Sequence, residues 1–200
     1  MSNSALIIGA GPAGLMAAER LLAQGAQVQI FDAKPSIGRK FLMAGKSGLN
    51  LTKNEPLAIF QNQYYGASAQ LAPMLNDFGP ADVMRWANAL GADVFSGSSG
   101  RVFPKAMKAS PLLRAWLLRL QDAGAELRVK SRWKTLSKEG CFGFETPSGP
   151  AQITPDVAVL ALGGGSWKKL GSDGQWVGIL AQHGVLSAPF KPSNAALQVA

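Results

Sequence analysis

The chain has 200 residues, of which 47% are hydrophobic and 16% are charged. This composition excludes a disordered chain and is sufficient for one sizeable buried core, so we expect one domain with at most a fragment of a second. The single cysteine, Cys141, excludes an internal disulfide framework and a cysteine zinc cluster, and it favours a reducing compartment, with the cytoplasm as the default.

The net charge of +8 allows two interpretations, a polyanionic partner such as RNA or DNA, or a solvated surface that also attracts cofactor phosphates. No arginine-rich tract is present, so we favour the second interpretation and keep RNA open as a partner. The apolar run at residues 5–10 has no basic leader and is too short to cross a bilayer. We therefore expect neither a signal peptide nor a membrane segment.

Residues 6–14 read LIIGAGPAG, an apolar strand that runs into a glycine turn and opens a helix. Each glycine suits a dinucleotide site: Gly9 allows a tight turn, Gly11 lets the backbone approach a pyrophosphate, and Gly14 lets the helix pack close to the strand. The phosphates would meet the free N–H groups and the positive end of this helix, where Pro12 and Ala13 lie.

Asp32 closes the next apolar run, residues 28–31, and lies 23 positions after Gly9. This spacing is near the roughly 20 residues expected for an acid that binds the ribose hydroxyls of a dinucleotide. A strand, a helix over residues 12–23, a second strand and this acid together predict a Rossmann-like domain of the α/β class. The carboxylate opposes NADP, because it would repel a ribose phosphate, but it does not separate FAD from NAD.

The rest of the chain adds further helices and strands. We expect a helix over residues 80–90, and another over residues 112–122 that is capped by Ser110 with Pro111 at its first position. Short strands over residues 126–137, 141–146 and 151–154 predict a small antiparallel β-meander. The apolar run at residues 157–162 predicts a buried strand that returns to the parallel sheet.

Four segments, in this order, resemble the signature of a bacterial flavoprotein family, the HI0933-like or BaiN-like NAD(P)/FAD-dependent oxidoreductases. They are residues 38–52 (GRKFLMAGKSGLNLT), 100–104 (GRVFP), 161–164 (ALGG) and 170–174 (LGSDG). The chain departs from the family pattern at Lys46 and Leu49, where the family has more glycines and a cysteine before the asparagine. The resemblance implies FAD as cofactor, with NAD(P)H docking transiently as electron donor because no second glycine-turn motif is present.

The predicted cofactor-binding residues fall into three groups. The glycine turn, Arg39 and Lys40 would bind the phosphates, and the small residues after position 44, with Asn50 and Thr52, would approach the flavin. By resemblance, Trp133 lies near the adenine, and Asp173 is either on the cofactor side or a helix N-cap. The full set is Gly9, Gly11, Pro12, Ala13, Gly14, Asp32, Ala33, Lys34, Gly38, Arg39, Lys40, Gly45, Ser47, Asn50, Thr52, Trp133, Ala161, Gly163, Gly164 and Asp173.

We assign no catalytic residue and no metal ligand, because a flavin carries the hydride itself. The single histidine, His183, is expected near a helix C-terminus, where the helix dipole favours it, rather than in an acid–base role.

The resemblance further implies that residues 1–190 form an incomplete FAD-binding domain and that residues 191–200 begin an inserted β-rich domain, so that the chain ends before the substrate domain. It implies hydride transfer between NAD(P)H, flavin and an unidentified unsaturated acceptor. Two other classes remain open, a non-catalytic FAD- or RNA-binding module and an NAD-dependent dehydrogenase.

Overall fold

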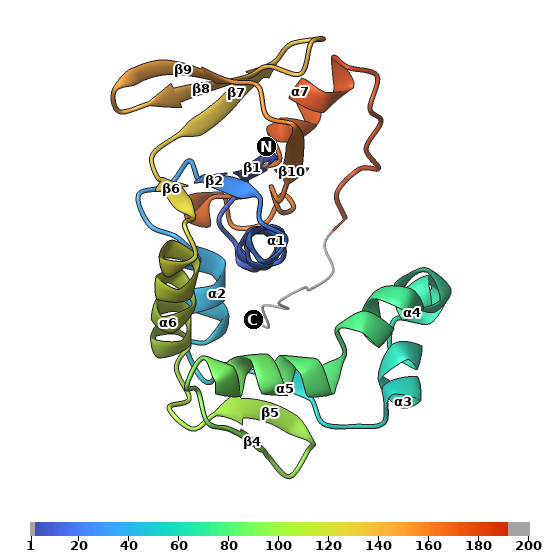
Figure 1. The fold of residues 1–200 in the computed structure, drawn as a ribbon. Helices are drawn as coiled ribbons and strands as arrows, with labels where there is room; N and C mark the ends of the chain where they lie inside the picture. The colour runs from blue at the N-terminus through green and yellow to red at the C-terminus, as the bar shows by residue number, and fades with distance from the viewer. Residues whose placement is uncertain (1–2, 192–200) are drawn as a thin grey trace, which may run out of the picture. The chain divides into compact units, whose positions relative to one another are not determined.

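A computed structural model describes residues 3–191, and the chain divides into two compact units (Figure 1). The first unit comprises Met1–Arg39 and Gly124–Ala200, and the second comprises Lys40–Ala123. The predicted start of an inserted domain at residues 191–200 lies outside the described residues, apart from Lys191.

The first unit is built on a four-stranded parallel sheet, which confirms the predicted α/β class (Figure 1). The strands, in spatial order, are β10 (Val157–Leu160), β1 (Ser4–Ile8), β2 (Gln27–Phe31) and β6 (Glu126–Arg128). The chain moves from β1 to β2 and β6 on one side and reaches β10 on the other. The strand order therefore reverses next to β1, and ligands of open α/β sheets bind outside the carboxyl ends of the strands at such a point.

Side chains along β1 alternate between the two faces of the sheet, and both faces are covered. On one face lies helix α1 (Pro12–Ala23), which contacts β1, β2 and β10 and buries Leu15 and Ala18 completely. The helix ends before Gly25, which has a φ of +80°. The predicted strand, helix and strand unit is thus confirmed.

The predicted small antiparallel meander is present, with three strands, and it packs against the other face of the sheet. Its strands are β7 (Arg132–Leu136), β8 (Phe142–Thr146) and β9 (Gly149–Ile153). Leu6, Ile8 and Phe31 from the sheet share a buried cluster with aromatic residues of the meander, and the rings of Phe31 and Phe144 have centroids 4.3 Å apart. This apolar layer holds the meander over the sheet.

Two strand predictions in this unit are wrong in part. Residues 126–137 do not form one strand: β6 stays in the parallel sheet, β7 belongs to the meander, and the chain changes direction at Lys130, with φ +54°. The returning strand is parallel, but it ends at Leu160 and is not buried. Val157 and Leu160 are 41% and 37% exposed, because β10 is the edge strand among the described residues.

The second unit combines helices with a three-stranded antiparallel sheet of order β3-β5-β4. Its elements are α2 (Arg39–Ala44, which begins one residue before the unit), β3 (Thr52–Lys53), α3 (Leu57–Asn62), η1 (Tyr65–Ala67), α4 (Ser68–Asp77), α5 (Pro80–Ala89), β4 (Val94–Ser96), β5 (Arg101–Pro104) and α6 (Ala109–Asp122). The rings of Trp86 on α5 and Trp116 on α6 pack edge to face, with centroids 4.7 Å apart. The bounds of α5, Pro80–Ala89, confirm the predicted helix at residues 80–90.

The predicted N-terminus of α6 is wrong. The helix begins at Ala109 after Lys108, without a side-chain cap, so Ser110 and Pro111 lie inside its first turn. Ala109 is buried in the same cluster as Leu112, and this packing extends the helix beyond the local capping signal.

None of the helices within residues 3–191 is long and apolar enough to cross a membrane.

Asp156 fastens the start of β1 to the turn before β10. Its Oδ2 atom accepts hydrogen bonds from the backbone N–H and the hydroxyl of Ser4, both at 2.7 Å. These bonds lower the pKa of Asp156 below its ordinary value of 3.8, and the bond from the backbone N–H of Ser4 has the largest effect. Because the folded-state pKa is the lower one, the stabilisation is present above the ordinary value and is lost as the pH falls through the folded-state pKa.

We expect Asp156→Asn to destabilise the chain at about pH 6 and to destabilise it less at about pH 3, because protonation of the carboxyl removes part of the stabilisation as the pH falls below the ordinary pKa of 3.8. Urea unfolding at the two pH values measures this difference. An equal loss of stability at both pH values would contradict it.

Candidate functional site

The glycine turn after β1 is closely packed on two of its three glycines. Gly9 has a φ of +106°, and a Cβ there would lie 2.3 Å from the carbonyl oxygen of Ala161. A Cβ at Gly14 would lie 1.9 Å from the carbonyl oxygen of Gly9. Only glycine fits at these two positions, because each would otherwise collide with backbone.

Gly11 differs from both, because a Cβ there would meet no atom within 4 Å. It is the N-cap of α1, its φ is −83°, and no side chain caps the helix, whose first turn contains Pro12. The open space therefore adjoins N–H groups that have no helical partner and the positive end of the helix dipole. This is an arrangement suited to an anion such as a phosphate.

Asp32 is held by backbone on both sides of its carboxylate. Its Oδ2 atom accepts the N–H of Ala10 at 2.9 Å, and its Oδ1 atom accepts the N–H of Lys34 at 2.8 Å. Its own backbone pairs with Arg128 and Ser131, at 2.9 and 2.8 Å. A carboxylate has about four acceptor positions, so this one keeps capacity for further donors such as ribose hydroxyls.

The loop after Asp32 folds back on the glycine turn. The N–H of Gly38 donates to the carbonyl oxygen of Ala10 at 3.0 Å, and Gly38 has a φ of +64°. Arg39 donates from Nη1 to the hydroxyl of Ser36 at 3.0 Å, while its buried Nε has no hydrogen-bond partner among the described residues. A buried guanidinium donor without a partner is unfavourable, and an anionic ligand would satisfy it.

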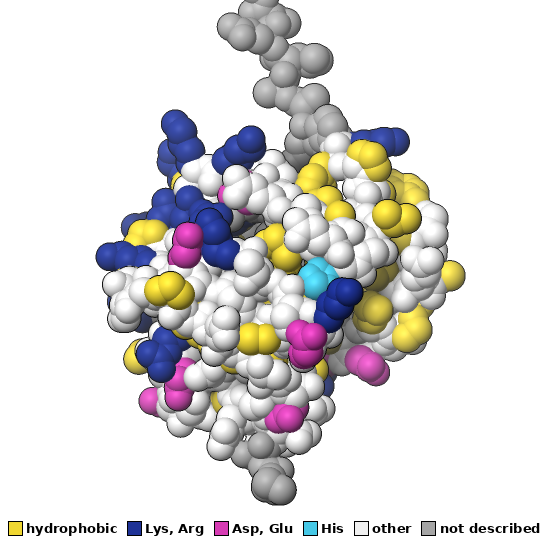
Figure 2. Space-filling view, turned by 90° about the horizontal axis from the view of Figure 1, so that it is seen from above, with side chains coloured by type: hydrophobic (Ala, Val, Ile, Leu, Met, Phe, Trp, Pro, Cys, Tyr) yellow, Lys and Arg dark blue, Asp and Glu magenta, His cyan; other side chains and the backbone are white. Residues whose placement is uncertain are grey.

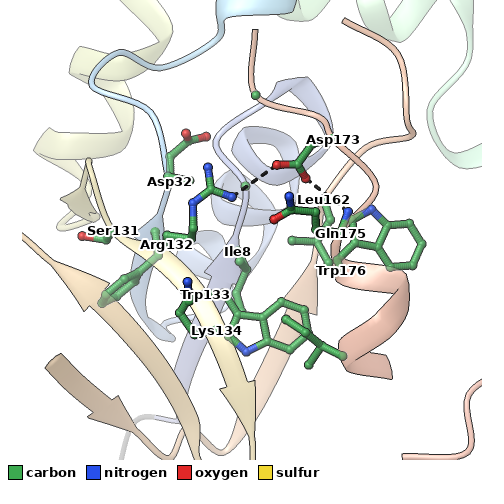
Figure 3. Close-up of a pocket in the computed structure, with 15 residues that line it drawn as sticks. Ile8, Asp32, Ser131, Arg132, Trp133, Lys134, Leu162, Asp173, Gln175 and Trp176 are labelled. Carbon is green, nitrogen blue, oxygen red and sulfur yellow. Dashed lines mark hydrogen bonds and ion pairs between the residues drawn. The ribbon is translucent and has the colours of Figure 1, made fainter. Parts of the chain in front are cut away.

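A cavity of about 260 Å³ opens at the carboxyl ends of β1 and β2, where the strand order reverses (Figure 3). This volume is below the ~300–1,000 Å³ of pockets that bury a whole drug-sized ligand, so the cavity suits one end of a dinucleotide. Its lining is Ile8, Gly9, Phe31, Asp32, Ala33, Ser131, Arg132, Trp133, Lys134, Leu162, Gly171, Asp173, Gln175, Trp176 and Ile179. Asp32 thus adjoins both the glycine turn and the cavity, and Ala33 lines the cavity.

Trp133 lines the cavity but is a core residue, 7% exposed. Its indole N–H donates to the carbonyl oxygen of Thr135 at 2.7 Å. Its one side-chain donor is therefore engaged, and the indole can offer a ligand only apolar surface. Contact with an adenine at this position stays a prediction.

Asp173 is not the N-cap of the following helix, α7 (Trp176–Ala181), whose N-cap is Gln175. Its Oδ1 atom accepts the backbone N–H of Gln175 at 3.2 Å, and its Oδ2 atom lies 3.3 Å from Nη1 of Arg132. The side chain of Asp173 lines the cavity together with Arg132 and Gln175 (Figure 3). This arrangement corrects the capping interpretation and leaves the cofactor-side one open.

The segment after β10 is ordered by a residue that the sequence analysis missed. The buried hydroxyl of Ser172 donates to the carbonyl oxygen of Gly164 and lies 3.4 Å from that of Leu162. The indole N–H of Trp176 donates to the carbonyl oxygen of Gly163 at 3.1 Å. The one sequence signal for Ser172 was its position directly before Asp173. The partners of Ser172 lie eight and ten residues away along the chain, so local spacing does not reveal them.

The other predicted residues lie in the second unit. Gly45 is buried, and a Cβ there would lie 2.6 Å from the Cβ of Ala109, so packing explains the need for glycine at this position. Thr52 pairs with Val102 in the antiparallel sheet. Ser47 and Asn50 are exposed, and Lys40 is partly buried. Contact of these residues with a cofactor stays a prediction.

Lys and Arg side chains gather toward one side of the face seen in Figure 2, with few acidic side chains among them. The single histidine, His183, lies just after α7, and its backbone N–H donates to the carbonyl oxygen of Leu180 at 3.0 Å. This position agrees with the expectation of a helix C-terminal residue.

Comparisons with known proteins agree with this architecture. The family model described as the HI0933-like protein Rossmann domain matches residues 3–190. A curated protein of Clostridium scindens, 3-dehydro-bile acid delta(4,6)-reductase, is 29% identical over 197 residues, which are 96% of this chain and 47% of that protein. The chain therefore spans about half the length of this relative.

Two solved structures resemble the fold at low sequence identity. The 3-ketosteroid-delta4-(5alpha)-dehydrogenase of Rhodococcus jostii RHA1 has a TM-score of 0.54 and 13% identity, over 82% of this chain and 46% of that chain. THI4 of Thermovibrio ammonificans has a TM-score of 0.52 and 18% identity, over 81% of this chain and 58% of that chain.

Proposed function

Because this chain belongs to the HI0933-like family, we propose that it forms the FAD-binding part of an oxidoreductase. The observation that carries the proposal is the position of the Asp32 carboxylate. Backbone N–H groups of Ala10 and Lys34 fix it where the glycine turn meets the cavity, with acceptor capacity to spare. A ligand with vicinal hydroxyls between a phosphate and a flat base fits that arrangement.

Each part of the first unit has a role in this proposal. The cavity takes the adenosine end of FAD, and Asp32 accepts hydrogen bonds from the ribose hydroxyls. The open N-terminus of α1 at Gly11 and the unpartnered Nε of Arg39 bind the pyrophosphate. The bound flavin supplies hydride transfer, and the protein supplies binding, orientation and charge.

The reaction that we propose is reduction of an unsaturated acceptor, with NAD(P)H as the electron donor. The curated relative is named a reductase, and its name supports this direction. In this proposal the nicotinamide nucleotide docks transiently over the flavin.

Titration of the purified chain with FAD, ADP, FMN and NAD tests the proposal. We expect FAD and ADP to bind and FMN to bind at least tenfold more weakly, because about 1.4 kcal/mol of contacts to the adenosine end is already a factor of ten. Binding of NAD without FAD would favour a dehydrogenase and contradict the proposal. Salt-dependent RNA binding without binding of FAD or ADP would contradict it in favour of an RNA-binding module.

A further inference from the structure

Arg132 lines the cavity, and the proposed function gives it no role. It is the first residue of β7, and it lies directly after Ser131, whose N–H donates to the backbone of Asp32 at 2.8 Å. Its Nη1 atom lies 3.3 Å from Oδ2 of Asp173, and both side chains line the cavity (Figure 3). Arg132 is thus held on two sides, by the backbone hydrogen bond of its neighbour Ser131 and by the ion pair of its guanidinium with Asp173.

The surroundings of this ion pair differ from those of an ordinary surface pair. The side chains of Arg132 and Asp173 are 37% and 24% exposed, whereas those of the Arg128–Glu126 pair on β6 are 57% and 54% exposed. The same cavity is lined in large part by apolar and aromatic side chains, those of Ile8, Phe31, Trp133, Leu162, Trp176 and Ile179. A flat, largely apolar group suits such a lining, and a planar guanidinium can stack on it.

A phosphate is a poor occupant for this place. Asp173 already neutralises Arg132, and the Asp32 carboxylate lines the same cavity. The second cation of the lining, Lys134, is paired with Glu145 at 3.2 Å. The two carboxylates therefore offset the two cations of the lining, and a phosphate would find no net positive charge there. A neutral heteroaromatic base needs no such charge, and guanidinium planes stack well on bases.

We propose that Arg132, held by Asp173, stacks its guanidinium on the base of the bound nucleotide and so contributes to the affinity for its adenosine end. The proposal rests on the proposed function, in which the cavity takes the adenosine end of FAD. Arg132 is then a ligand-binding residue, and Asp173 is a positioning residue that fixes its plane.

The variants Arg132→Met and Arg132→Lys, titrated with FAD and with ADP, test this role. A lysine keeps the charge but not the plane. We expect both variants to bind both ligands about tenfold more weakly, the size of effect that loss of one cation–base stack produces. Asp173→Asn is expected to weaken binding by about threefold, because Arg132 keeps a hydrogen-bond acceptor but loses its charged anchor. Arg128→Met, which breaks an arginine pair outside this cavity, should bind like the wild type.

The outcomes separate this inference from the proposed function. A wild-type chain that binds neither FAD nor ADP would overturn both. A wild-type chain that binds them, together with an Arg132→Met variant that binds within twofold of it, would overturn the stacking role alone. Full rescue by Arg132→Lys would show a charge interaction with phosphate and would likewise overturn it. Thermal melting identifies any variant that does not fold, and Arg132→Lys, the closest replacement, then decides.

Discussion

Replacing Asp32 by alanine is expected to lower FAD affinity by about 100-fold, since hydrogen bonds to a charged group contribute about 1.5–3 kcal/mol each. The change removes the acceptors for the ribose hydroxyls. It also frees the N–H groups of Ala10 and Lys34, which the carboxylate now orients. The glycine turn thus loses its ligand contact and its support together.

Fluorescence titration with FAD measures the effect, and two variants sharpen it. Asp32→Glu keeps a carboxylate and should retain most of the affinity, because either acid can bind ribose hydroxyls. Asp156→Asn removes a carboxylate at the opposite end of β1 and should leave FAD binding unchanged. If Asp32→Ala bound FAD as tightly as Asp156→Asn, the carboxylate would not be a ligand-binding group.

Replacing Gly14 by alanine is expected to destabilise the chain by about 3 kcal/mol or more, because the new methyl group cannot be accommodated without moving backbone. Its Cβ would lie 1.9 Å from the carbonyl oxygen of Gly9 and 3.2 Å from Cγ2 of Ile7. The first is a backbone atom of the glycine turn, so α1 would have to move away from β1. We expect loss of cooperative unfolding or a much lower midpoint in urea.

Gly11→Ala is the matched comparison, because it adds the same methyl group three residues earlier in the same turn. Its Cβ would meet no protein atom within 4 Å, and its φ of −83° suits alanine. Stability should therefore stay within about 1 kcal/mol of the wild type. Affinity for FAD should fall all the same, because the methyl group would occupy the space assigned to the pyrophosphate. Equal stability of Gly14→Ala and Gly11→Ala would contradict this packing.

The first unit was largely predictable because its signals are local. The glycine turn, the helix that ends before Gly25, and Asp32 lie within one short stretch, and their spacing alone gives a strand, a helix and a second strand. The meander was predicted because turn residues separate its short strands. Each of these features can be read without knowledge of distant contacts.

The errors arose where distant packing decides the structure. The strand at residues 126–137 breaks because Lys130 and Ser131 pair with the loop after β2, nearly 100 residues earlier. The α6 helix starts at Ala109 because that residue is buried in the core of the second unit. Helix α4 escaped prediction because Pro73 lies inside it, and proline normally marks a helix end.

The candidate site was predicted in part, for the same reason. Sequence spacing identified Gly9, Gly14 and Asp32, which are now seen at one edge of the sheet. It could not identify Arg132 or Ser172, because their importance depends on partners, Asp173 and Gly164, that the fold alone brings close.

The absorbance spectrum of the freshly purified chain, with chromatography of the nucleotide released on denaturation, tests FAD binding most directly. We expect flavin bands and release of FAD, either from the chain as purified or after incubation with added FAD. Release of a nicotinamide dinucleotide, or a colourless chain that takes up no added FAD, would contradict the assignment of this site to FAD.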